Sequence, residues 1–231
     1  MSGRFWAIAT IVAGLVTLGI SVAFAMLPEV TAAGECFARG AVVQFEFARN
    51  VADLVATFGE PESACRPQIV NAMDAVNHLD MLAFIPAYTL FGICAALFLA
   101  NGVWQRPLVI IAIGVSLLAA AADYLETTTL LALTQTLDAP GGLLQYSQLG
   151  AWSKFALLAA HAVFCAGICY TSDKPRYILG AVLMLPPFGV AAAAYDHVTL
   201  SNVMAAGFTV AWVALLVMAV VSAVRAKGAR A

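Results

Sequence analysis

The sequence predicts an all-α, polytopic integral membrane protein with six transmembrane helices. Of its 231 residues, 63% are hydrophobic and only 10% are charged, whereas soluble domains carry about 25% charged residues. The mean hydropathy is +0.92. This composition excludes a disordered chain and an ordinary soluble domain. The net charge of −2 provides no basic field, so we expect no nucleic-acid partner.

Charged residues divide the chain into six apolar windows, and five of them have, or nearly have, the ~20 residues that a helix needs to cross the hydrocarbon core. The window 107–122 is short, so its helix must carry Asp123 and Glu126 into its outer part. The first window resembles a signal peptide at Ala23-Phe24-Ala25, but its apolar run is long for one, and we expect a retained helix. The predicted helices are 5–27, 81–100, 107–128, 151–171, 176–195 and 203–224. They form a single transmembrane domain over residues 1–231.

The distribution of Lys and Arg predicts the orientation. The two short outer loops, 129–150 and 196–202, have none. The long first loop has three, Arg39, Arg49 and Arg66, and Lys154 stands at a helix end. The segments on the side of the N-terminus hold the other seven: Arg4, Arg106, Lys174, Arg176, Arg225, Lys227 and Arg230. The positive-inside rule therefore places both termini in the cytoplasm, in a bacterial-type inner (plasma) membrane.

Residues 28–80 are predicted to form a periplasmic loop that belongs to the same domain. An apolar face of this loop has helical spacing, and Gly59 and Pro61 end the helix. Arg49 and Asp53 are spaced for an i,i+4 pair on the polar face. The apolar face comprises Phe47, Val51, Leu54, Val55 and Phe58, and the polar face Glu46, Arg49, Asn50, Asp53 and Thr57. We expect an amphipathic helical lid, followed by a helix from Pro67 that Pro86 kinks.

Two of the five cysteines, Cys36 and Cys65, lie in this outer loop, where a disulfide is permitted. We predict that they are linked, which closes a loop of about 30 residues and stabilises it by about 3 kcal/mol. The alternative is two separate thiols. Cys94, Cys165 and Cys169 lie in spans and are interpreted as small packing residues.

Charged residues recur at one height near the outer edge of the hydrocarbon. Glu126, Lys154 and Asp196 each stand 20 residues along their helices from a cytoplasmic charge, which corresponds to about 30 Å at 1.5 Å per residue. His197 is adjacent, and Asp80 is expected at the top of the second span. These residues either form a convergent site beneath the lid or merely mark the membrane interface.

Asp123 lies one helical turn deeper than Glu126 on the same face. A lone carboxylate costs about 2.5–3.5 kcal/mol at mid-membrane, so it needs a partner or a proton. Lys154, at matching height on the next helix, is predicted to lie within salt-bridge distance of Asp123 or Glu126. Tyr88, which shares a helix face with Asp80, could supply a hydroxyl group. A purely structural salt bridge is the competing interpretation.

The Pro186-Pro187 pair is predicted to interrupt the fifth span near the midplane, because proline has no N–H and clashes with the preceding turn. His161 is at similar height on the fourth span. We predict that it points into the bundle, stays neutral, and bonds either this broken turn or a polar group of the Asp123 site. A histidine satisfied by its own helix, or by Ser or Thr, is the alternative.

The leading functional hypothesis is that an outer-facing intramembrane polar pocket binds or transforms a lipid or other hydrophobic ligand. The candidate catalytic or cation-binding residues are Asp123, Glu126 and Lys154, and the candidate ligand-binding residues are Asp80, Tyr88, His161, Asp196 and His197. The alternatives are a proton- or cation-coupled transporter and a non-catalytic subunit of a larger membrane complex. No motif for a metal, nucleotide or hydrolase site occurs, so whether the protein is an enzyme, and with which cofactor, stays open. Membrane lipids are the expected partners, and an oligomer is compatible with the small residues of the helices.

Overall fold

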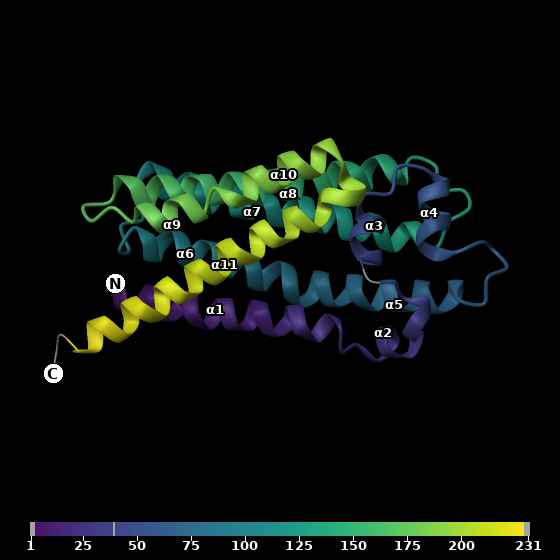
Figure 1. Cartoon of the computed structure of the whole chain (residues 1–231), viewed down its shortest axis with the longest axis horizontal. Helices are drawn as coiled ribbons and strands as arrows, with labels where there is room; N and C mark the ends of the chain where they lie inside the picture. The colour runs from purple at the N-terminus through teal and green to yellow at the C-terminus, as the bar shows by residue number, and fades with distance from the viewer. Residues whose placement is uncertain (1–2, 39, 229–231) are drawn as a thin grey trace. The chain divides into compact units, whose positions relative to one another are not determined.

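The computed structural model describes residues 3–38 and 40–228, with the backbone alone for Val198 and residues 226–228. Every regular element in this part of the chain is helical (Figure 1). The elements are α1 (Gly3–Phe24), α2 (Pro28–Ala33), η1 (Gly34–Cys36), α3 (Ala41–Glu46), α4 (Val51–Phe58), α5 (Arg66–Leu79), η2 (Asp80–Phe84), α6 (Ile85–Leu99), α7 (Pro107–Leu133), α8 (Leu143–Thr171), α9 (Tyr177–Val182), α10 (Leu185–Tyr195) and α11 (His197–Gly228). Arg39 and Arg230, two charges behind the predicted orientation, lie outside the described residues.

Six stretches of the described chain are long and apolar enough to cross a membrane, which confirms the predicted multi-pass class. Three of the helices extend well beyond their predicted bounds. α7 continues to Leu133 and α8 starts at Leu143, so both reach past the apolar windows. The polar residues of these extensions do not end the helices, because a helix satisfies its backbone hydrogen bonds internally whatever its side chains are. The six stretches are Gly3–Cys36, Arg66–Leu99, Pro107–Leu133, Leu143–Thr171, Tyr177–Tyr195 and Thr199–Arg225.

The chain packs as two compact units, and α1, α7 and α8 each contribute to both. The first unit comprises the described parts of residues 1–17, 87–119 and 155–231. Its core gathers aromatic and aliphatic side chains such as Phe91, Phe98, Ile168, Leu183 and Leu215. The second unit comprises the described parts of residues 18–86 and 120–154.

The second unit is built around the segment that joins the first two spans. α3 and α4 bury Phe45, Leu54 and Phe58 in a cluster with side chains of α5 and α7. The rings of Phe45 and Phe58 meet edge to face at 4.8 Å. The predicted Cys36–Cys65 disulfide is present and ties η1 to the residue before α5. α2 lies beside α5 (Figure 1), so the whole segment is fixed against the helices of its unit.

The predicted amphipathic helix is two short helices. α4 starts at Val51, because the Asn50 side chain accepts a hydrogen bond from the Asp53 N–H at 3.0 Å and caps the helix. Asp53 Oδ2 in turn accepts from the backbone N–H of Arg49 at 2.7 Å. The expected i,i+4 pair between the Arg49 and Asp53 side chains is therefore wrong in form, because Arg49 precedes the helix and contributes its backbone N–H.

Irregular turns accompany prolines in two spans, and the predicted interruption of the fifth span is confirmed. A π-helical turn, Asp80–Phe84, lies just ahead of Pro86, as expected where a proline removes a bond from the ladder. In the fifth span, α9 ends at Val182 and α10 begins at Leu185, with Pro186 and Pro187 in its first turn. α10 then packs closely on α11, since a Cβ on Gly189 would meet Met204 Cα at 2.8 Å.

Candidate functional site

The second unit contains a buried lysine. The Lys154 side chain, on α8, is only 8% exposed. Its Nζ lies 2.7 Å from Glu126 Oε2 and 3.2 Å from Asp123 Oδ1, both on α7. The predicted salt bridge between Lys154 and one of these carboxylates is confirmed, and Lys154 contacts both.

A third carboxylate comes from α3. Glu46 Oε1 accepts a hydrogen bond from Lys154 Nζ at 3.1 Å, and its side chain is 14% exposed. Sequence reasoning missed this residue, because it placed Glu46 on the polar face of one continuous helix. The Asn50-x-x-Asp53 pattern, a helix-start signal, could have revealed that a separate helix begins at Val51. Because the chain breaks between α3 and α4, Glu46 does not share a helix face with the polar residues of α4.

Asp80 joins α7 through a hydroxyl group. Its Oδ2 accepts a hydrogen bond from Thr127 Oγ1 at 2.9 Å, and Thr127 follows Glu126 in the chain. Asp80 also interacts electrostatically with Lys154 and Asp123. Asp80 therefore completes a group of five ionisable side chains from four elements, which we call the Lys154 cluster: Glu46, Asp80, Asp123, Glu126 and Lys154.

A glycine sets the geometry of this cluster. A Cβ on Gly150 would lie 2.7 Å from Glu126 Cβ and 2.8 Å from its Cα and N, so α8 touches the backbone of α7 there. The two helices run in opposite directions. One turn further along α8 is Lys154, and one turn back along α7 is Asp123. The close approach at Gly150 therefore brings the ammonium group to both carboxylates of α7.

The charges of the cluster do not balance. Four carboxyl groups face one ammonium group, and the Glu126 side chain has 0% exposure. Among the described residues, Glu126 Oε1 has no hydrogen-bond partner. Buried negative charge in excess of one ammonium group costs several kcal/mol per ion in order of magnitude, so protons or another cation are favoured there.

Glu46 lies outside the membrane-spanning stretches, and its carboxyl group shows the same effect. Burial raises the pKa of Glu46 above its ordinary value of 4.5, and the negative charge of Asp123 acts in the same direction. The charge of Lys154 and its hydrogen bond lower the pKa of Glu46 but do not offset burial. The cluster can therefore hold a proton on Glu46 under conditions where an exposed glutamate is ionised.

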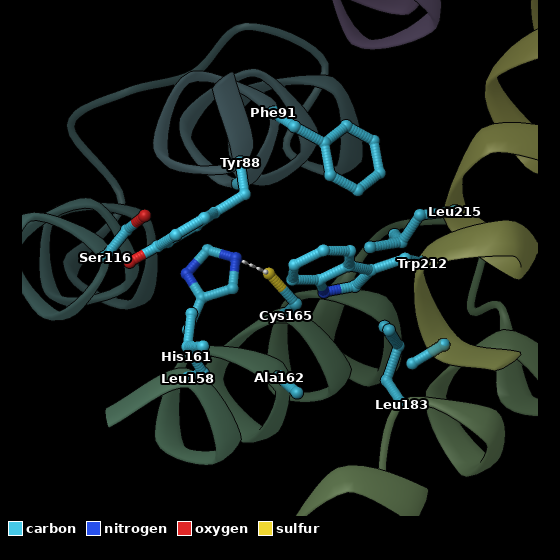
Figure 2. Close-up of a pocket in the computed structure, with 12 residues that line it drawn as sticks. Tyr88, Phe91, Ser116, Leu158, His161, Ala162, Cys165, Leu183, Trp212 and Leu215 are labelled. Carbon is cyan, nitrogen blue, oxygen red and sulfur yellow. Dashed lines mark hydrogen bonds between the residues drawn. The ribbon is translucent and has the colours of Figure 1, made fainter. Parts of the chain in front are cut away.

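The first unit places His161 differently from the prediction. The ring is buried, as expected, but its Nδ1 lies 3.0 Å from the Ala112 carbonyl oxygen on α7. Its Nε2 lies 3.4 Å from Cys165 Sγ, one turn further along α8 (Figure 2). The prediction that His161 bonds the Pro186 turn or the Asp123 site is wrong, because matched height does not fix the rotation of a helix about its axis.

Three further predicted ligand-binding residues, Tyr88, Asp196 and His197, belong to the first unit as well. Tyr88 is buried and stacks on Trp212, with ring centroids 6.0 Å apart. Asp196 caps α11, since its carboxylate accepts from the Thr199 N–H at 3.2 Å and from the Thr199 hydroxyl at 2.6 Å. His197 is the first residue of α11. The structure thus gives Asp196 a capping role, and the ligand roles of all three residues stay predictions.

No group of three or more His, Cys, Asp or Glu side chains among the described residues is arranged to hold a metal ion. Comparison of the chain with protein-family models, curated proteins and solved structures finds no match.

Proposed function

We propose that this membrane protein binds and releases protons at the Lys154 cluster and functions as a proton-coupled transporter. The observation that supports this proposal best is the contact of one buried ammonium group with three carboxylates, those of Glu46, Asp123 and Glu126. Ionisable groups inside membrane spans are rare, and they often belong to proton relays and ion pathways.

The burial of the cluster favours a proton over a larger ligand. The side chains of Asp123, Glu126 and Lys154 are 3%, 0% and 8% exposed. Contact of a lipid head group with these atoms requires movement of a helix, whereas a proton needs only a water molecule or a hydroxyl group beside them. The Lys154 ammonium already stands between the carboxylates, which leaves protonation as the simplest way to neutralise the remaining charge.

A hydrophobic ligand, the leading hypothesis from the sequence, is our second candidate. Glu126 Oε1, which has no hydrogen-bond partner among the described residues, would accept a bond from a ligand hydroxyl group. In that case Asp123 and Glu126 would act as acid and base, and Lys154 would tune their charge.

We also propose that the protein resides in a bacterial-type inner membrane with both termini in the cytoplasm. Seven Lys and Arg residues lie in the segments on that side, and the two short loops on the opposite side have none. The Lys154 cluster then lies near the outer face, with α3 and α4 as its outer lid.

A pH jump tests proton binding directly. Proteoliposomes on a solid-supported membrane should give a transient current when protons enter the cluster. The current should persist in Asp138→Asn, which changes a 63%-exposed carboxylate, and should disappear in Glu126→Gln. A wild-type protein without current, or a Glu126→Gln variant with the same current, would contradict the proposal. A lipid that copurifies with wild-type protein but not with Glu126→Gln would instead support the second candidate.

A further inference from the structure

A small cavity in the first unit has none of the residues of the Lys154 cluster in its wall. It has a volume of about 20 Å³, and a cavity of about 10–15 Å³ on this measure suffices for one water molecule. Apolar cavities of this size stay empty, whereas polar ones hold water when two to four groups can bond it. The side chains that matter in its wall are Tyr88, Ser116, His161, Cys165 and Trp212.

His161 offers a hydrogen-bond acceptor to this cavity. Its Nδ1 contacts the Ala112 carbonyl oxygen at 3.0 Å, and a carbonyl only accepts, so Nδ1 carries the hydrogen and donates it. In the neutral ring Nε2 is then the acceptor. The Cys165 thiol at 3.4 Å is a weak donor, which a water molecule can displace.

Ser116 offers the second group. Its side chain is buried, and its Oγ reaches the Thr89 carbonyl oxygen only at 3.5 Å, the long limit of a hydrogen bond. Figure 2 shows the Tyr88 hydroxyl on the same side of the imidazole as the Ser116 hydroxyl. A water molecule beside the Ser116 hydroxyl would give it a partner at normal hydrogen-bond distance.

Gly92 keeps the space open. A Cβ on this residue would lie 3.0 Å from Ser116 Oγ and 3.3 Å from His161 Nε2. The missing side chain therefore leaves room where the two polar groups converge. Alanine at this position would occupy that room without removing any polar atom.

We propose that the cavity binds one water molecule, which donates to His161 Nε2 and bonds the Ser116 hydroxyl, with the Tyr88 hydroxyl as a third neighbour. The water molecule and the imidazole form a second proton-exchanging site, built from residues other than those of the Lys154 cluster. The binding of this water molecule depends only on the cavity and its polar groups. The role of this water in proton movement rests on the proposed function.

Water-edited solid-state NMR on lipid-reconstituted protein tests the site. The three histidines are labelled with ¹⁵N, and His161→Gln identifies the His161 signals. Magnetisation should pass from water to the His161 ring in the wild-type protein and in Gly114→Ala, a glycine of α7 with no atom within 4 Å of an added Cβ. In Gly92→Ala the transfer should fall several-fold.

Ser116→Ala provides a second variant that cannot crowd its neighbours, and it should also slow the transfer. A wild-type ring that receives no magnetisation from water, or equal transfer in Ser116→Ala and the wild-type protein, would overturn the water site. The pH-jump current keeps the two proposals apart. A dry cavity with a normal current refutes only the water site, and a wet cavity without current refutes only the proposed function.

Discussion

Lys154 is the residue on which the buried charges depend. Its ammonium group lies within 3.2 Å of an oxygen of Asp123, Glu126 and Glu46. Removal of one partner of a buried ion pair is strongly destabilising because the remaining charge has no compensation, whereas removal of both partners is much milder. Lys154 compensates several charges at once. Its removal should therefore destabilise the protein more than removal of any one carboxylate.

Replacement of Lys154 by methionine should destabilise the protein by about 3–5 kcal/mol. The double variant Lys154→Met/Asp123→Asn should be more stable than the single variant, because one stranded carboxylate is gone. Unfolding in detergent, followed by circular dichroism, measures both effects. Lys174→Met, at an exposed position, serves as the control and should change stability little. A double variant less stable than Lys154→Met would contradict this account.

Glu46 should make stability depend on pH. A carboxyl group whose pKa is raised in the folded protein binds its proton more tightly there than in the unfolded chain. Its contribution is therefore complete below the ordinary value of 4.5 and is lost as pH rises through the raised pKa. The stability of wild-type protein relative to Glu46→Gln should accordingly fall as pH increases from 4.5 toward neutrality.

Thermal unfolding midpoints across this pH range provide the measurement. The charged groups that act on Glu46 are Lys154 and Asp123. Both residues are therefore kept unchanged in the two proteins that are compared. Glu62→Gln, at an exposed position of the same segment, should follow the wild-type curve. Parallel curves for wild-type protein and Glu46→Gln would show that Glu46 is not the responsible group.

At the scale of elements, the contact between α7 and α8 decides where the charges meet. Gly150 lies against the backbone of Glu126, and a side chain there would overlap atoms that cannot turn away. A backbone contact of this kind is rigid, since only movement of a whole helix relieves it. The helix pair thus fixes the distance between Lys154 and the two carboxylates of α7.

Gly150→Ala should destabilise the protein by about 1–3 kcal/mol through overpacking. It should also weaken the pH-jump current, because the two helices move apart. Gly114→Ala, on α7 with open space around it, should be neutral or stabilising by up to about 1 kcal/mol. Equal stability of the two alanine variants would mean that the helices do not touch at Gly150.

At the scale of the whole molecule, the remaining question is which side of the membrane each segment faces. The disulfide between Cys36 and Cys65 lies in the segment that we propose to be periplasmic. Disulfides persist in oxidising compartments and are rare in the cytosol. Both the disulfide and the positive-inside pattern therefore favour the same orientation.

Thiol labelling of intact cells tests this orientation. A membrane-impermeant reagent should label Cys36 and Cys65 only after reduction, and from the outside. Cys36→Ser/Cys65→Ser should abolish that labelling and cost about 3 kcal/mol of stability, from the loop that the disulfide closes. Labelling without a reductant would disprove the disulfide, and labelling from the cytoplasmic side would reverse the orientation.

Local properties of the sequence were sufficient to predict the spans and the disulfide. Membrane crossing depends on about 20 consecutive apolar residues, so the windows could be located without knowledge of packing. Cys36 and Cys65 were the two cysteines outside the predicted spans. The prediction that Lys154 contacts Asp123 or Glu126 followed from heights, because every α-helix rises about 1.5 Å per residue.

Only the tertiary structure decided which neighbours the side chains of each helix contact. Glu46 joined the Lys154 cluster because the chain breaks before Val51, and His161 met the Ala112 carbonyl oxygen instead of the Pro186 turn. The rotation of a helix about its axis is set by close contacts such as that of Gly150 with Glu126. These contacts depend on side chains far apart in the sequence. The sequence by itself therefore determined the heights of the charged residues along their helices, and packing determined their partners.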